Sequence, residues 1–260
     1  MFAGTKIVKS AFDLYEADSK RLIQHSNRVV SACERLLKAD FSDAACEIEI
    51  KKINSPLAFS YGNAFGFKEE KIVRIQLYVD APDTLFNSAF VSEWFHQTLS
   101  HEWHHGARAL RNENGCGLTI GEALISEGLA VRYQEEFTGI HPWLRWPSVP
   151  TRFPAYVFTP MTPEQLQSFS QKIVPELSSL EDKKRDVRLY DDKQSEEYPH
   201  LCGYAFGDWI VGHYLYAHKT TATECVGLSA DKIIGWFLEK ASEPVRRAAT
   251  NPPPSAHILG

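Results

Sequence analysis

The residues of this sequence best suited to chemistry are two histidines and a glutamate in the stretch 91–112. His101-Glu102-Trp103-His104-His105 matches the pattern H-E-x-x-H. On a helix, residues four apart lie on one face, so His101 and His105 can point their imidazoles at one metal ion. Glu102 lies about 100° round the helix from His101, where it can reach a water on that ion. The pattern therefore predicts a zinc site with a bound water and a glutamate base.

A helix that carries this pattern must pack through another side. Several apolar residues lie within about 60° of the side opposite His101; they are Phe95, Leu99, Trp103 and Leu110. Buried histidines need a partner, and a metal ion is one. We expect the helix to pack through these apolar residues and to present His101, His105, Thr98 and Arg108 on the other side.

A catalytic zinc site needs a third protein ligand, and the next predicted helix, residues 119–138, offers two candidates. Glu122 and Glu127 are five residues apart and so point to roughly opposite sides of that helix. Glu122 sits in the first turn, where the helix dipole alone explains a carboxylate. Glu127 sits among apolar residues, where a carboxylate is costly to bury without a partner. This favours Glu127 as the ligand, with Glu122 or an ion pair to Arg108 as the alternatives.

Two segments together resemble a known family. H-E-W-H-H-G-A-R, followed after a short turn by E-A-L-I-S-E-G-L-A, is similar to the DUF2268 family of predicted zinc-dependent proteases, which belongs broadly with the gluzincins. The resemblance covers about forty residues strongly, and extends more weakly to G-Y-A-F-G at 203–207. It implies His101, His105 and Glu127 as ligands of Zn²⁺ and Glu102 as the base.

Better-known zinc patterns do not continue through the chain. A metzincin would place a glycine and a third histidine where Arg108 and Arg111 stand, and a thermolysin-like enzyme would place an aspartate at Val131. We expect Arg108 to orient a carboxylate, with Glu127 as the first choice. Tyr204 is the candidate donor to a developing oxyanion, because gluzincins commonly take such a donor from their C-terminal part.

Composition indicates an ordinary globular protein. The chain has 260 residues, 43% hydrophobic and 23% charged, with a net charge of -5, and so gives no reason to expect nucleic acid as a partner. Its five cysteines are scattered without a C-x-x-C pair, which favours buried thiols in a reducing compartment. Neither a signal peptide nor a membrane span is apparent, so we expect a cytoplasmic protein without a membrane partner.

The remaining pattern predicts an α+β, mostly helical, zincin-like fold. We expect a small N-terminal β-sheet packed against the HExxH helix, and a helical C-terminal half. The whole chain, residues 1–260, would form a single zincin-like catalytic domain, with lobes at 1–140 and 141–260 and the zinc cleft between them. The pattern predicts strands at 45–54 and 71–80, a loop or irregular strand at 58–67, a proline-rich lid or connector at 141–160, and helices at 9–38, 119–138, 162–180, 201–218 and 229–241.

The predicted function is that of a zinc-dependent metallopeptidase acting on a peptide or protein substrate. If strand 71–80 lies at a sheet edge, it could pair with an extended peptide. Two alternatives remain open. One is a non-catalytic or chaperone-like zinc-binding protein with closed coordination, and the other is a zinc hydrolase of non-peptide amides.

Overall fold

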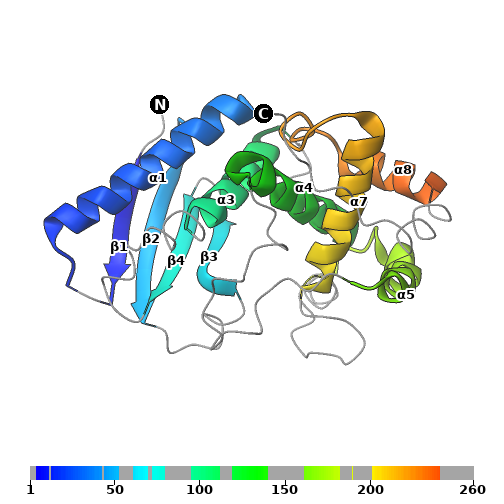
Figure 1. Ribbon diagram of the computed structural model, residues 1–260, viewed down its shortest axis with the longest axis horizontal. Helices are drawn as coiled ribbons and strands as arrows, with labels where there is room; N and C mark the ends of the chain where they lie inside the picture. The colour runs from blue at the N-terminus through cyan, green and yellow to red at the C-terminus, as the bar shows by residue number, and fades with distance from the viewer. Residues whose placement is uncertain are drawn as a thin grey trace. The chain divides into compact units, whose positions relative to one another are not determined.

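The computed structural model describes residues 4–11, 13–42, 44–52, 61–69, 72–79, 95–111, 119–139, 161–181, 189 and 201–240 (Figure 1). Contacts divide the chain into two units. The first comprises residues 1–107 and 147–156, and the second comprises residues 108–146 and 157–260. The division falls inside the HExxH helix and not near residue 140, where the sequence suggested a boundary between lobes. The single catalytic domain stays a prediction.

The first unit contains the expected small sheet. Among the described residues, its four strands run in the order β1 (Thr5–Ser10), β2 (Ala45–Lys52), β4 (Ile72–Val79) and β3 (Tyr61–Glu69). β1, β2 and β4 are parallel, and β3 is antiparallel to β4. The strands at 45–54 and 71–80 are therefore confirmed, and the segment predicted as a loop or irregular strand forms a regular strand.

One expectation for this unit is wrong. Strand β1 was not predicted, and its last two residues, Lys9 and Ser10, lie where the sequence suggested the start of a helix; helix α1 begins only at Glu16. β1 is short and mostly polar, and its pairing with a strand some forty residues later (Thr5 with Cys46) is invisible to local periodicity. The sequence left open whether strand 71–80 lies at a sheet edge; β4 lies between β2 and β3, so it is not an edge strand.

Helix α1 (Glu16–Leu37) covers one face of the sheet, and Figure 1 shows it lying obliquely across the strands. Alternate residues of β4 are buried, as the strand period requires. Ser26 links the layers by accepting from Thr5 Oγ1 at 2.9 Å and donating to Cys46 Sγ at 3.6 Å. The buried apolar residues described in the helix and the two central strands are Leu22, Val29, Val30, Cys33, Leu37, Cys46, Ile48, Ile50, Val73, Ile75 and Leu77.

The HExxH helix is α3 (His96–Arg111), and its apolar side packs within the first unit. Trp103 packs against Phe41 in a tilted arrangement with ring centroids 4.5 Å apart, and the ring centroids of Phe95 and His25 on α1 are 5.6 Å apart. Phe95, Trp103 and Leu99 are all buried, as predicted. Leu110 is the exception: it is 60% exposed, because it lies in the last turn, beyond this packing.

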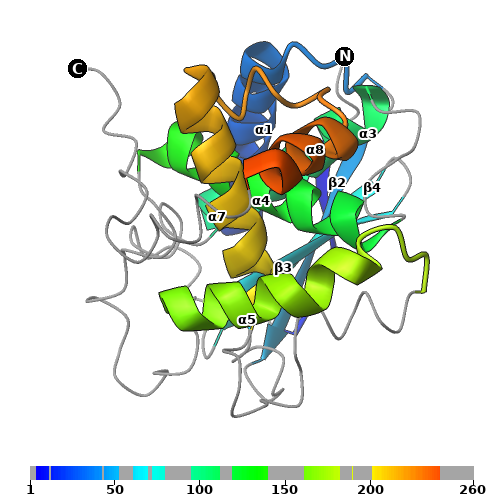
Figure 2. The ribbon, with the colours of Figure 1, turned by 90° about the vertical axis from the view of Figure 1, so that its right-hand side faces the viewer.

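The second unit is helical throughout its described part (Figure 2). It contains α4 (Ile120–Thr138), α5 (Pro163–Ile173), the short 3-10 helix η5 (Val174–Glu176), α7 (Cys202–His218) and α8 (Ala230–Lys240). Thr162 and Gln165 form the predicted capping box of α5. That helix ends at Ile173 and not near residue 180, because Pro175 cannot continue it. The mostly helical fold with an N-terminal sheet is confirmed, and its zincin-like character stays a prediction.

Other expectations are met in part. The four described cysteines, Cys33, Cys46, Cys202 and Cys225, are free and buried, and burial raises the pKa of the Cys46 thiol to about 11. Among the helices that the structure describes, none combines the length and apolar character needed to cross a membrane. Cys116 and the segment 141–160 lie outside the described residues.

Candidate metal centre

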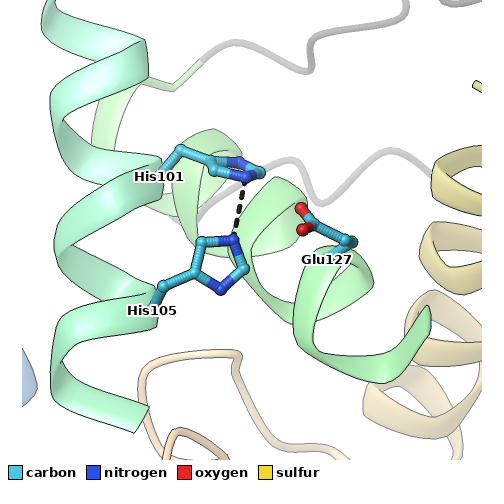
Figure 3. A group of neighbouring side chains, drawn as sticks. All are labelled: His101, His105 and Glu127. Atoms are coloured by element: carbon cyan, nitrogen blue, oxygen red, sulfur yellow. Dashed lines mark hydrogen bonds between the residues drawn. The ribbon is translucent and has the colours of Figure 1, made fainter. Parts of the chain in front are cut away.

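Three of the predicted residues lie together. His101 and His105 on α3 and Glu127 on α4 form a group whose potential ligand atoms are all within 4.8 Å of one another (Figure 3). The two Nε2 atoms are 3.1 Å apart, and the rings meet edge to face at a centroid distance of 4.8 Å. In Figure 3 the carboxylate of Glu127 points toward the two rings. The i,i+4 spacing has placed both imidazoles on one side of the helix, as predicted.

This geometry fits zinc. Tetrahedral zinc with Zn–N distances of about 2.0–2.1 Å separates two ligand nitrogens by about 3.3–3.4 Å, close to the 3.1 Å measured between the Nε2 atoms. Two imidazoles and one carboxylate are a ligand set of catalytic zinc sites, and three protein ligands leave a fourth position for water. Among the described residues the group has three members, so His104 does not complete it.

The burial of α4 singles out Glu127. Every residue from Ile120 to Glu135 is buried except Glu127, which is partly exposed. The helix packs tightly at the neighbouring Gly128, where an added Cβ would come within 3.0 Å of backbone atoms of Gly207 and Asp208 on α7. The close approach at Gly128 is to α7, and it fixes the backbone next to Glu127.

The other acidic residues of α4 bind different partners. Glu122 accepts from Arg108 Nη2 at 2.7 Å and from Nε at 3.0 Å. Glu135 accepts from Arg132 Nη1 at 3.4 Å, and Glu136 accepts from the amides of Ala222 and Thr223. One expectation is thereby corrected: Arg108 orients Glu122 and not Glu127. Glu122, the alternative third ligand, is bound to a guanidinium and is not a member of the metal group.

Burial has a cost for these carboxylates. Desolvation raises the pKa of Glu122, and the guanidinium of Arg108 acts in the opposite direction. Desolvation also raises the pKa of Glu136, against the donors of Ala222 and Thr223. A carboxylate held in such surroundings requires donors close at hand, because an unpaired buried charge is strongly disfavoured.

Two predicted residues lie outside the group of three. Glu102 follows His101 on α3 and is 7% exposed. Tyr204 is partly exposed on α7, one turn before Asp208, whose carboxylate makes a 2.6 Å ion pair with Nε of Arg132. Their catalytic roles stay predictions.

The sequence did not predict the contacts that join α3 to α4 and α4 to α7. They are the Arg108–Glu122 pair and the Gly128–Gly207 contact. The glycines did carry a signal: glycine in a helix interior is unfavourable by about 1 kcal/mol relative to alanine, so one retained there suggests a close approach of another backbone. No feature of the sequence indicated that Arg108 binds Glu122.

Helix α3, with the HExxH motif, and helix α4, with Glu127, together form the candidate metal centre of this protein. A model of the family described as "Predicted Zn-dependent protease (DUF2268)" matches residues 78–235, well over half of the chain. The chain belongs to this family. All three members of the metal group, as well as Glu102 and Tyr204, lie within the matched range.

One relative is the "Uncharacterized protein YjaZ" of Bacillus subtilis (strain 168). It is 31% identical to this chain over 145 residues, which are 54% of this chain and 49% of the relative. The chain thus spans about half the length of the curated relative it matches.

Proposed function

We propose that the protein is a zinc-dependent metallopeptidase of gluzincin type. The observation that carries the proposal is the grouping of His101, His105 and Glu127 from two successive helices, with ligand atoms within 4.8 Å. Membership of a family of predicted zinc-dependent proteases supports the choice of metal and reaction. The zincin-like fold and the peptide substrate are part of the proposal.

In this mechanism His101, His105 and Glu127 would hold the ion. Zinc bound there would polarise the scissile carbonyl and lower the pKa of its water toward about 7. Glu102 would accept the proton of the attacking water on a carboxylate oxygen and then donate it to the leaving amine. The hydroxyl of Tyr204 would donate a hydrogen bond to the carbonyl oxygen as negative charge develops there. A peptide substrate could pair with β3, which lies at the end of the sheet among the described strands, whereas β4 is central.

The test is metal analysis together with cleavage of a broad peptide library. Glu102→Gln should retain stoichiometric zinc and lose cleavage, because the amide cannot take up the proton. His105→Ala should lose the metal, and His218→Ala serves as the control, since His218 is exposed near the end of α7 and outside the metal group.

Three other outcomes would each have a definite meaning. Unchanged cleavage by Glu102→Gln would refute the mechanism, and stoichiometric zinc in His105→Ala would refute the ligand assignment. A wild-type protein that binds zinc in closed coordination and cleaves no peptide would favour the non-catalytic alternative. Hydrolysis of non-peptide amides alone would favour a zinc hydrolase of another class.

A further inference from the structure

Arg108 is a buried guanidinium whose partners come from two segments, the start of α4 and the turn at 226–228. Its side chain is 0% exposed. Nε and Nη2 both donate to Glu122 Oε1 on α4, at 3.0 and 2.7 Å. Nη1 donates to the carbonyl oxygens of Val226 and Leu228, at 3.3 and 2.7 Å. Because Arg108 has no exposed surface and these nitrogens already donate to protein groups, it connects segments of the protein and does not contact a substrate.

Glu122 extends the connection to further backbone groups. Its own amide donates to Thr119 Oγ1 at 3.0 Å, which caps the start of α4. Its carboxylate also accepts from the amide of Ala230, the first residue of α8. The pair thus joins the end of α3, the start of α4, the turn at 226–228 and the start of α8.

The location of the pair along the two helices matters for the metal group. Arg108 lies three residues after His105, and Glu122 lies five residues before Glu127. At a rise of about 1.5 Å per residue, these separations are about 4.5 and 7.5 Å along the helix axes. A helix is stiff over one or two turns, so a shift at the pair carries over to the ligand on the same helix.

The energetics of buried ion pairs argue for a geometric role. Replacing such a pair by well-packed apolar residues is often neutral or stabilising, because desolvation offsets much of the attraction. A guanidinium donating through two nitrogens, however, fixes both distance and orientation, which apolar contacts do not. Stability alone therefore gives little reason for a buried arginine at this position.

We propose that Arg108 and Glu122 are positioning residues that set the approach of α3 to α4 at which His101, His105 and Glu127 bind one zinc ion. The proposal rests on the proposed zinc site. It assigns the arginine of the H-E-x-x-H-x-x-R segment to the assembly of the metal centre and not to recognition of a substrate.

The test compares Glu122→Gln with Glu136→Gln. Both glutamates are on α4, and both accept from backbone amides in the segment 222–230, but only Glu122 binds a residue of α3. The zinc dissociation constant is measured by competition with a chromophoric chelator. The free energy of unfolding is measured in urea on the metal-free protein.

We expect Glu122→Gln to raise the zinc dissociation constant about 10- to 100-fold, the range found when groups that support metal ligands are removed. Glu136→Gln should lower stability but leave zinc affinity within about threefold, because Glu136 has no link to α3. Arg108→Lys keeps the charge but loses the two-nitrogen geometry, so it should fold and show an intermediate loss of affinity.

Equal zinc affinity in wild type and Glu122→Gln would overturn the positioning role while leaving the zinc site intact. Equal losses in Glu122→Gln and Glu136→Gln would also overturn it, because the effect would then follow general destabilisation. If Glu122→Gln does not fold, Arg108→Lys decides the question by the same two measurements. Absence of zinc binding by the wild type would instead refute the proposed function itself.

Discussion

The contact between α4 and α7 predicts a large difference between two glycine-to-alanine substitutions. At Gly128 an added Cβ would lie 2.9 Å from the amide nitrogen of Asp208, and closer still to the carbonyl group of Gly207. These are backbone atoms and cannot rotate away. At Gly235 on α8 an added Cβ would meet nothing within 4 Å. The two sites therefore test the same substitution with and without a neighbouring helix.

The expected magnitudes follow from this geometry. To restore contacts of ordinary length, α4 and α7 must move apart by about 1 Å at Gly128. Overpacking of this kind costs about 1–3 kcal/mol, and we expect the upper end because both surfaces are backbone. The better helix propensity of alanine raises the free energy of unfolding by about 1 kcal/mol at either site. The net result should be a loss of about 2 kcal/mol for Gly128→Ala and a gain of about 0.5–1 kcal/mol for Gly235→Ala.

Urea unfolding of the metal-free protein, followed by far-UV circular dichroism, measures both values. Zinc affinity should also fall in Gly128→Ala, since Glu127 is the adjacent residue and moves with the same turn of α4. Gly235→Ala should leave zinc affinity unchanged. If the two variants unfolded at the same urea concentration, the close packing of α4 on α7 would be refuted.

Two further substitutions test buried charge. Burial lowers the pKa of His25 to about 4, with smaller contributions from His96, Arg28 and Arg21. The neutral form of His25 therefore contributes stability above about pH 6.5, and this stability is lost as the pH falls toward 4. In urea unfolding, the free energy of unfolding of the wild type should fall by about 1–3 kcal/mol more than that of His25→Gln between about pH 7 and pH 4.5. Arg132→Met leaves the buried carboxylates of Asp208 and Glu135 without their cation, and should cost about 3–5 kcal/mol in the same assay at neutral pH.

The parts of the fold that the sequence predicts well are those set by local periodicity. β2, β4 and most helices were found because side chains alternate or recur within a single element. The capping box of α5 was found because it needs only four consecutive residues. β1 was missed because its evidence is a parallel partner, β2, that follows a whole helix later. For the same reason, the central place of β4 could not be read from its own residues.

The same difference between local and long-range contacts decides which parts of the candidate site the sequence predicts. The two histidines follow from helix geometry, since residues four apart share a face whatever surrounds the helix. The partner of Arg108 does not follow, because Glu122 and the carbonyl groups of Val226 and Leu228 are 14 to 120 residues away. The motif places the arginine beside the histidines, and only the tertiary structure shows which carboxylate it binds.

The choice of the third ligand has a stronger basis than the motif alone. Of the four acidic residues of α4, Glu122 binds a guanidinium, Glu135 binds another, and Glu136 binds backbone amides. Each of these contacts offsets the desolvation of a buried carboxylate. Glu127 lies instead beside two imidazole rings, at the partly exposed position in an otherwise buried stretch of helix. Two imidazoles and a carboxylate are a ligand set of catalytic zinc sites, and a divalent cation is a partner that all three side chains can share.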